Sequence, residues 1–314
     1  MTDAKLSYIL ATDSLATVRG VVEHLARQTR ADRVELVLIS PAALGAREAL
    51  AASGLGAVLE VRCESPLRLA AARALGVQAA SAPYVFLGET HSFPEPELVE
   101  SLLEGFAGPW SAVVPALVNA NPRAPTSCAG FLLDYGVWDP ERPAEEVETP
   151  LVYNAAHRRE ALLGLGERLA AGLSAVDHDL WRELAAGGHR ARFEPAARIR
   201  HLNVAAGRAF ARERFLCGVR LGLHRAHRWP LARRLLYAAA APLAAAVLAQ
   251  RSTPAIRTHL RHGRLPRGTL AWIAAALALR VTGEALGYLG FAPRGLEAEL
   301  TELELHKSRY AGAT

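Results

Sequence analysis

The sequence predicts an α/β fold, with a mostly parallel sheet flanked by helices over residues 1–204 and a basic, apolar helical region over residues 205–314. In the first part, apolar runs typical of buried parallel strands alternate with helical spacing. Hydrophobic residues make up 51% of the chain but aromatic residues only 6%, and the many alanines and leucines favour helices over an all-β fold. At 314 residues the chain can hold one large α/β domain with an appendage, or two modest domains.

The first elements follow a β-α-β order. The run KLSYILATD starts as a strand, SLATVRGVVEHLARQT has the apolar spacing of a helix, and RVELVLISPA is a continuous apolar run of the kind that doubly buried strands show. The pattern continues with AREALAASG, the short strand AVLEVR, the helix SPLRLAAARALGVQAA and the strand PYVFLG. This order predicts a doubly wound sheet that binds its ligands at the carboxyl ends of the strands.

The next segments are less regular. The helix EPELVESLLEGFAG and the strand SAVVPALVNA precede two passages rich in turn residues, NANPRAPTSCAG and DYGVWDPERPAEEVETP, which predict loop or lid structure. Order resumes with AAHRREALLGLG, the helix DHDLWRELAAGG and the strand-like RARFEPAARIRHLN.

Residues 205–314 differ in charge from the rest of the chain. They hold 17 Lys and Arg residues but only 6 Asp and Glu residues, whereas residues 1–204 are acidic. The arginines flank apolar stretches and do not alternate with aromatic residues as in single-strand binders, so an anionic membrane surface is a better partner than nucleic acid. The first apolar run is short and contains Pro242, and the second carries Arg280 and Glu284, so we expect interfacial or re-entrant helices in place of clean membrane spans.

The cysteines and the N-terminus bear on the compartment. Cys63, Cys128 and Cys217 lie far apart without a shared ligand spacing, which indicates a reducing compartment and no disulfide framework. The N-terminal residues show no basic segment followed by a long apolar run, so no secretory signal is expected. The expected location is cytoplasmic, peripheral or monotopic at the inner face of the cell membrane.

The order of the motifs resembles that of the family 2 inverting glycosyltransferases, which have the GT-A nucleotide-sugar-binding fold. The segments ATDS, LVLISP, AARALGVQAA and YVFLGETHSFPEPELVE stand where that family has its two nucleoside-binding strand ends, its Ala-Arg-Asn-x-Gly helix and its Asp-x-Asp metal motif. Further along, NAAHRRE, VDHDL and FEPAARIRH are similar to the family's later motifs. The resemblance covers roughly residues 5–203.

The resemblance implies a hexosyltransferase-type enzyme. It would move a sugar from a nucleotide-sugar donor to a lipid-linked or polysaccharide acceptor at the cytoplasmic membrane face, with Mn²⁺ or Mg²⁺ as cofactor; homo-oligomerisation stays open. The positions that correspond to donor-binding residues are Thr12, Asp13, Ser40, Arg73, Glu89, Asn154 and Arg158.

Several motif positions depart from the family pattern. Ser40 stands where the family usually has an aspartate that binds the uridine, and Asp13 and Ser14 replace the usual Tyr-Asn pair. The Asp-x-Asp motif has become Glu89-Thr90-His91, and Val176 replaces the Glu of the Glu-Asp pair.

Glu89, His91 and His201 are the candidate metal ligands. Transfer from a nucleotide sugar needs the diphosphate leaving group neutralised, usually by a divalent cation with carboxylate ligands. Glu89 and His91 point to opposite sides if the strand continues, and they converge if the chain turns after Gly88. His201 would complete a mixed nitrogen and oxygen site, which tolerates Mn²⁺ better than a pure carboxylate site does. The alternative is that Glu89 and His91 cap the next helix and face solvent.

Asp177 is the candidate catalytic base. An inverting transfer needs one carboxylate to remove the proton of the acceptor hydroxyl, and a helix N-terminus at LWRELAAGG would keep this carboxylate ionised. An ordinary helix cap is the alternative, and Asp179 is the competing residue for either role.

A second function fits the same motifs. A catalytically silent GT-A domain could serve as a membrane-recruited scaffold in polysaccharide assembly, which the altered Asp-x-Asp motif and Ser40 favour. The retention of Glu89, Asp177 and His201 favours the enzyme. A nucleotidyltransferase is a third option, but the first strand lacks a nearby glycine-rich phosphate loop.

Overall fold

The chain forms two compact units in the computed structural model, which describes residues 4–174 and 179–312. The sheet unit comprises Met1–Val118 and Pro140–His201, and the helical unit comprises Asn119–Asp139 and Leu202–Thr314. The predicted first domain, residues 1–204, includes residues 119–139, whereas in the structure these residues belong to the helical unit.

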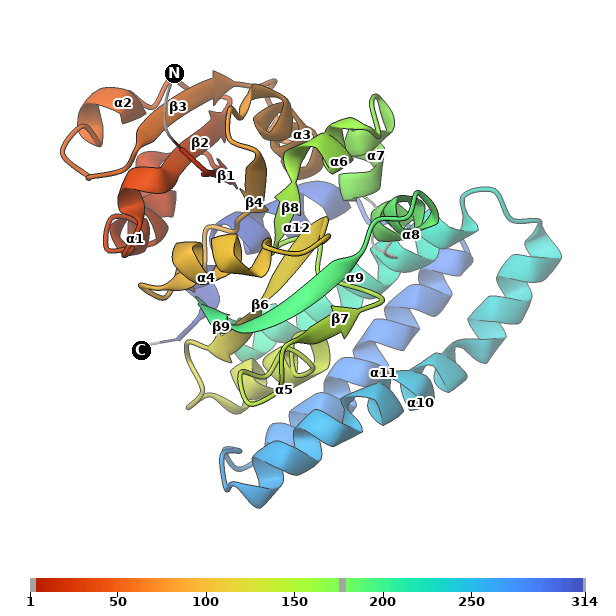
Figure 1. The fold of residues 1–314 in the computed structure, drawn as a ribbon. Helices are drawn as coiled ribbons and strands as arrows, with labels where there is room; N and C mark the ends of the chain where they lie inside the picture. The colour runs from red at the N-terminus through yellow and green to blue at the C-terminus, as the bar shows by residue number, and fades with distance from the viewer. Residues whose placement is uncertain (1–3, 175–178, 313–314) are drawn as a thin grey trace. The chain divides into compact units, whose positions relative to one another are not determined.

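Four parallel strands form one half of the sheet, in the order β3-β2-β1-β4 (Figure 1). Every residue of β1 and β2 is buried, which explains why both read as unbroken apolar runs in the sequence. Parallel pairing brings the carboxyl ends of these strands to the same edge of the sheet. The strands are β1 (Leu6–Ala11), β2 (Val34–Ser40), β3 (Ala57–Arg62) and β4 (Tyr84–Leu87).

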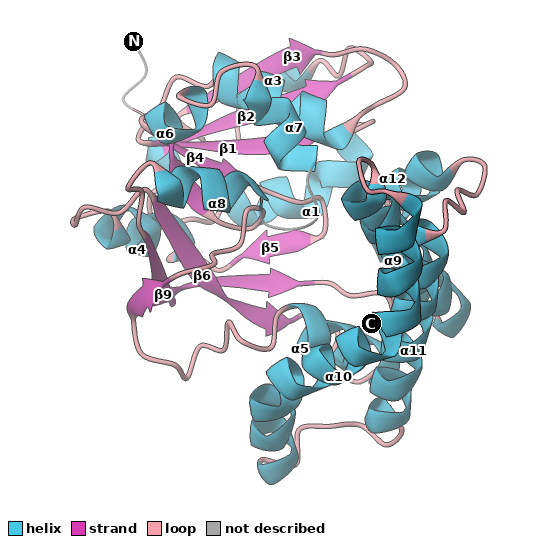
Figure 2. Ribbon diagram, turned by 90° about the vertical axis from the view of Figure 1, so that its right-hand side faces the viewer, coloured by secondary structure: helices cyan, strands magenta, loops and turns pink. Residues whose placement is uncertain are grey.

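The other half of the sheet departs from the predicted mostly parallel pattern. β8 runs antiparallel to both β4 and β6, and β9 runs antiparallel to both β5 and β7. Figure 2 shows β5, β6 and β9 in this half. The strands are β5 (Ser92–Pro94), β6 (Ala112–Asn119), β7 (Glu145–Val147), β8 (Ala156–Arg158) and β9 (Ala191–His201).

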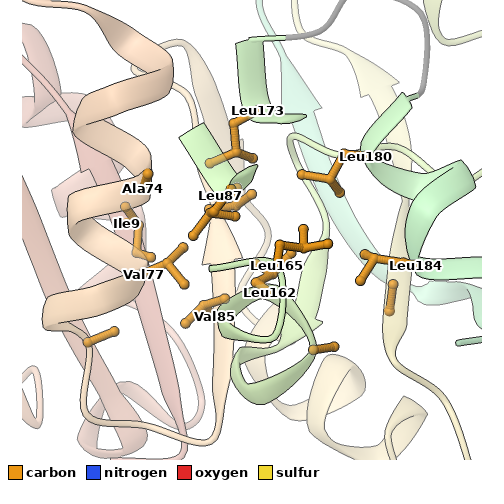
Figure 3. Packing of buried hydrophobic residues seen from close by; sticks show 14 of the residues in the cluster. Ile9, Ala74, Val77, Val85, Leu87, Leu162, Leu165, Leu173, Leu180 and Leu184 are labelled. Atoms are coloured by element: carbon orange, nitrogen blue, oxygen red, sulfur yellow. The ribbon is translucent and has the colours of Figure 1, made fainter. Parts of the chain in front are cut away.

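Helices flank the sheet and close its core. α1 begins after Ser14, whose side chain accepts a hydrogen bond from the backbone N–H of Thr17 at 3.3 Å. One large core cluster joins β1, β2 and β4 to helices that follow much later in the chain, as Ile9, Leu87 and Leu162 illustrate (Figure 3). The helices are α1 (Leu15–Leu25), η1 (Ala31–Arg33), α2 (Ala46–Ala49), α3 (Leu69–Ala79), α4 (Leu98–Gly105), α6 (Arg159–Leu163), α7 (Arg168–Ser174) and α8 (Asp179–Ala186).

The helical unit includes a helix where the sequence predicts only loop or lid structure. α5 (Pro125–Asp134) begins with a proline, whose fixed φ suits the first helical turn, and residues 126–132 are buried. Its small residues and its proline are typical of turns, so the sequence pattern does not identify it. The other helices of this unit are α9 (Gly207–Ala226), α10 (Leu231–Arg261), α11 (Thr269–Tyr288), α12 (Leu296–Leu305) and η2 (Lys307–Tyr310).

α9 and α11 pack against each other through glycines. Gly218 and Gly222 of α9 lie against the backbone of α11, and Gly283 and Gly287 of α11 lie against the backbone of α9. A Cβ atom at any of the four would overlap a carbonyl oxygen of the other helix. Spacing glycines four residues apart on both helices permits this backbone contact, as in small-residue pairs of membrane helices.

α10 is one continuous helix of 31 residues, although Pro242 and Pro254 lie inside it (Figure 1). The first apolar run, which is short in the sequence, is therefore only part of a much longer helix. Alanines and leucines on both sides of Pro242 favour the helix strongly enough to offset the lost hydrogen bond. By length and composition, α10 and α11 are both able to cross a membrane, and α10 is the more exposed of the two.

Candidate metal and donor-binding site

The end of β4 turns sharply at Gly88. The Gly88 N–H donates to the carbonyl of Ile9 at 3.0 Å, so Gly88 continues the hydrogen-bonded pairing of β4 with β1. A Cβ atom here would overlap the ring of Tyr8, and only glycine fits. The chain then turns, and the Ser92 N–H donates to the carbonyl of Glu89 at 3.3 Å. This turn places Glu89 and His91 side by side, which is the condition under which the sequence predicts that they converge.

His201 reaches the same place from the other end of the chain. It is the last residue of β9, and the antiparallel pairing of β5 with β9 sets it opposite Ser92. Ser92 directly follows His91 in the sequence. The strand register therefore brings together two histidines that are 110 positions apart.

Three ligand atoms form a nearly equilateral triangle. Glu89 Oε2 lies 3.3 Å from His91 Nε2 and 3.3 Å from His201 Nε2, and the two nitrogen atoms are 3.2 Å apart. The imidazole rings are almost perpendicular, at 84°. All three side chains are buried, which contradicts the alternative that Glu89 and His91 face solvent.

Asn154 and Ser92 hold the Glu89 carboxylate. Asn154 Nδ2 donates to Glu89 Oε2 at 2.6 Å, and Ser92 Oγ donates to the same oxygen at 3.2 Å. Asn154 has a left-handed backbone with φ of 54°, a conformation that asparagine adopts more readily than most residues. Its N–H also donates to the carbonyl of Leu87 at 2.8 Å, which fixes this turn to the end of β4.

The cluster keeps Glu89 charged. Burial raises the pKa of Glu89, but the hydrogen bonds from His201 and His91 and the charge of the two imidazoles outweigh this effect and hold the pKa well below its ordinary value. Tyr8, whose ring covers Gly88, is fully buried. Burial, together with the charge of Glu89, raises the pKa of the Tyr8 hydroxyl, which therefore stays protonated.

The donor set fits a divalent cation. Nitrogen and oxygen ligands bound at about 2.0–2.2 Å in tetrahedral or facial octahedral geometry are separated from each other by roughly 2.8–3.6 Å, and the three atoms of the triangle fall in this range. Among residues 4–174 and 179–312, this is the only group of three or more His, Cys, Asp or Glu residues with such closely spaced ligand atoms.

Two further predicted donor-binding residues lie at the carboxyl ends of β1 and β2. Thr12 follows β1, and its N–H donates to the carbonyl of Ile39 at 2.9 Å. Ser40 ends β2, and its hydroxyl accepts a hydrogen bond from the Ala42 N–H at 3.2 Å. Both are buried, whereas the neighbouring Asp13 is exposed.

Arg73 and Arg158 have different surroundings. The Arg73 guanidinium lies 4.1 Å from the ring centroid of Tyr153, the residue before Asn154. Arg158 pairs with Tyr84, at the opposite end of β4 from Glu89. Its guanidinium donates to the carbonyl of Trp110 at 2.7 Å. The structure therefore does not bring Arg158 to the edge that carries Glu89.

The predicted base, Asp177, lies outside the described residues. Its competitor Asp179 is the first residue of α8 and forms an ion pair with Arg182. Tyr8 and Ser92 were not predicted as parts of the site. Ser92 directly follows the Glu-Thr-His motif, and Tyr8 is the single aromatic residue of its strand, so both carried a weak signal.

Comparison with known proteins gives structural matches only. The sequence matches no protein-family profile and no curated protein. The mannosyltransferase PcManGT from Pyrobaculum calidifontis, solved in complex with GDP-Man and Mn²⁺, is similar over 92% of this chain and 88% of its own, with a TM-score of 0.56 and 18% identity.

Two more glycosyltransferase structures are similar at lower TM-scores. Residues 1–349 of S. aureus TarS in complex with UDP match over 92% of this chain and 93% of theirs, with a TM-score of 0.48 and 14% identity. GalNAc-T7 with UDP, GalNAc and Mn²⁺ matches over 63% of this chain and 43% of its own, with a TM-score of 0.49 and 15% identity. At these identities, the likeness to the mannosyltransferase shows the fold, which is GT-A.

Proposed function

We propose that this protein is a family 2 inverting glycosyltransferase of the hexosyltransferase type. One observation carries the proposal: a buried carboxylate and two imidazoles form a metal-sized triangle at the carboxyl end of a parallel strand in a GT-A sheet. Ligands of doubly wound sheets bind outside the carboxyl ends of the strands. The structurally similar mannosyltransferase was solved with a nucleotide sugar and a divalent ion, which supports this assignment.

Different residues of the site would have different roles in the transfer. Glu89, His91 and His201 would hold a divalent cation, which supplies positive charge to the diphosphate leaving group. Asn154 holds Glu89 in place through its 2.6 Å hydrogen bond. Thr12 and Ser40 lie at the neighbouring strand ends and would contact the donor nucleotide.

Asp177 completes the proposed reaction as the base. Its carboxylate would accept the proton of the acceptor hydroxyl while the hydroxyl oxygen attacks the anomeric carbon from the face opposite the diphosphate. The C–O bond to the diphosphate breaks as the new glycosidic bond forms, which inverts the anomeric configuration.

The helical unit supports a membrane-bound acceptor, either lipid-linked or a growing polysaccharide, at the cytoplasmic face. The stretch of α10 from Leu231 to Val247 exposes several large apolar side chains, among them Leu231, Leu235, Leu236, Leu243 and Val247. Residues 208–267 contain 13 arginines and a single acidic residue, Glu213. Basic residues beside an exposed apolar helix surface favour the interface of an anionic bilayer.

Donor binding and transfer test the proposal separately. The full chain is mixed with a panel of nucleoside diphosphates and nucleotide sugars, with and without Mn²⁺, and the thermal midpoint and the release of nucleoside diphosphate are measured. We expect one nucleotide sugar to raise the midpoint and to be turned over. Stabilisation without turnover in the presence of lipid or glycan acceptors would favour the silent scaffold, and no stabilisation by any donor would overturn the enzyme.

A further inference from the structure

Two arginines of the helical unit, Arg220 of α9 and Arg280 of α11, form what we call the arginine pair. Neither guanidinium has a hydrogen bond or an ion pair with residues 4–174 or 179–312, and the Nε atom of each is buried. A buried N–H group without an acceptor is costly, and more so when the group is charged. Both residues are only half-buried, so a ligand can still approach them from solvent.

Both arginines lie near the thiol of Cys217. Burial raises the pKa of this thiol, and the charges of Arg220 and Arg280 both act against the rise. The two helix backbones also meet here, because Gly218 of α9 lies against the carbonyl of Arg280. The glycine contacts between α9 and α11 therefore fix the backbone positions from which the two guanidinium groups extend.

The carboxylates near the arginine pair are bound by other cations. Asp134 of α5 pairs with Arg214, whose terminal nitrogen atoms lie 2.7 Å and 2.9 Å from its two oxygen atoms. Glu213 lies 3.3 Å from Arg214 and 3.9 Å from Lys307. The charge of Arg280 helps to lower the pKa of Asp134, but no ion pair joins the two among the described residues. Neither carboxylate therefore neutralises the arginine pair by contact.

Two neighbouring guanidinium groups suit a phosphate group. Each presents its N–H donors in a planar fork, which matches two oxygen atoms of a phosphate at a time. A terminal phosphate or a diphosphate has enough oxygen atoms and negative charge for two forks, whereas a carboxylate has only two oxygen atoms. The arginine pair therefore favours a phosphate over a carboxylate.

The surroundings of the arginine pair favour a lipid as the source of this phosphate. α10 packs on the end of α11, where the rings of Tyr237 and Tyr288 lie 5.8 Å apart. At a rise of 1.5 Å per residue, Arg280 lies about 12 Å along α11 from Tyr288. α10 exposes Leu235 and Leu236 next to Tyr237. A bilayer that accepted these leucines would bring its phosphate groups close to the arginine pair, because the headgroups lie directly outside the hydrocarbon core.

We infer that Arg220 and Arg280 form a binding site for a phosphate or diphosphate that is carried by a lipid. The inference deepens the proposed function by naming the headgroup of its lipid-linked acceptor, and it rests on that function only there. It concerns binding by the metal-free protein, so it is tested without donor and without transfer.

The first test compares vesicles that differ in their anionic headgroup. Full-length protein in EDTA is mixed with phosphatidylcholine vesicles that contain either phosphatidic acid, which presents a terminal phosphate, or a fatty acid, which presents a carboxylate. The two kinds of vesicle are matched in surface charge, and bound protein is measured by flotation. We expect the wild type to bind the phosphatidic acid vesicles about fivefold more tightly, or better. Equal binding to both would overturn the lipid phosphate as the ligand.

Matched variants test the arginine pair itself. Arg220→Gln and Arg280→Gln should each lose the preference for phosphatidic acid. Arg208→Gln, which removes an exposed arginine from the same helix as Arg220, should keep it. Arg280→Lys retains the charge near Asp134 but lacks the planar fork, so it should fold like the wild type and still lose the preference. An unchanged preference in both glutamine variants, or an equal loss in Arg208→Gln, would overturn the inference.

A soluble ligand distinguishes a lipid phosphate from free phosphate. The same proteins are titrated with inorganic pyrophosphate in EDTA, which leaves no ion at the metal site to hold it, and the thermal midpoint is measured. We expect pyrophosphate to stabilise the wild type and Arg208→Gln but neither Arg220→Gln nor Arg280→Gln. Stabilisation that both of these variants retain would count against the arginine pair. Stabilisation that needs both arginines, without any preference among vesicles, would keep the phosphate site and overturn the lipid as its source.

The outcomes separate this inference from the proposed function. Phosphate binding through the arginine pair in a protein that turns over no nucleotide sugar would leave the inference standing and count against the enzyme. Sugar transfer by a protein whose binding to phosphatidic acid is unchanged in both glutamine variants would do the reverse.

Discussion

Acid should destabilise the sheet unit through His157, which lies in β8 between β4 and β6. This imidazole is fully buried, and its Nε2 lies 2.9 Å from the carbonyl of Val152. Burial lowers the pKa of His157 to about 4, and the hydrogen bond to Val152 offsets this only in part. The contact also closes the turn that carries Asn154, so the stability of this turn bears on the metal site.

The size and sign of the effect follow from proton linkage. The unfolded chain binds a proton at His157 below its ordinary pKa of about 6.5, whereas the folded chain binds it only below about 4. Well above pH 6.5 both states are neutral and His157 does not affect stability. As the pH falls from 7 to 5, the unfolded state gains protons that the native state excludes, which costs about 2 kcal/mol of unfolding free energy from this single group.

The assay compares His157→Gln with the wild type in urea unfolding at pH 7 and pH 5. Glutamine can still donate to the Val152 carbonyl but does not titrate, so the wild type should lose about 2 kcal/mol more than the variant between the two pH values. His262→Gln, which removes an exposed histidine, should behave like the wild type. Equal losses in wild type and His157→Gln, or a His157 proton resonance that titrates near pH 6.5, would refute the reasoning.

Three further predictions follow from the site and the helical unit. Asp177→Asn should abolish transfer while donor binding stays nearly intact in the thermal-shift assay, because the amide cannot accept a proton; normal turnover would leave Asp179 as the candidate base. Replacing the exposed Leu236 and Leu243 together with Ser should weaken co-sedimentation with anionic liposomes without changing the thermal midpoint, and unchanged binding would count against insertion of α10. Gly222→Ala should cost about 1–3 kcal/mol of unfolding free energy because its methyl group overlaps α11, whereas Gly164→Ala, at a roomier position, should be close to neutral.

The parallel half of the fold could be predicted because its strands are buried on both faces. Such strands appear as unbroken apolar runs, as β1 and β2 do. In the antiparallel half, the long strands β6 and β9 were predicted, but β5, β7 and β8 have three residues each, too few to show any periodicity, so the antiparallel pairing was not visible in the sequence.

The candidate site could be predicted only in part. Glu89 and His91 are separated by one residue in the sequence, and a turn after Gly88 was enough to bring them together. The resemblance suggested His201, but its distance to them depends on the register of β5 with β9, which no local pattern encodes. The hydrogen bond of Asn154 likewise depends on a left-handed turn set by contacts with β4.

The glycine contacts between α9 and α11 also determine where each helix lies along the axis of the other. If α11 slid along α9 by one turn, one glycine of each pair would lose its counterpart, and a side chain would have to enter a space that holds only backbone. The slide would also pull the buried Glu284 away from Arg225, which donates to it at 2.8 Å. The two helices are therefore held in one axial register, and they can shift only as one rigid piece.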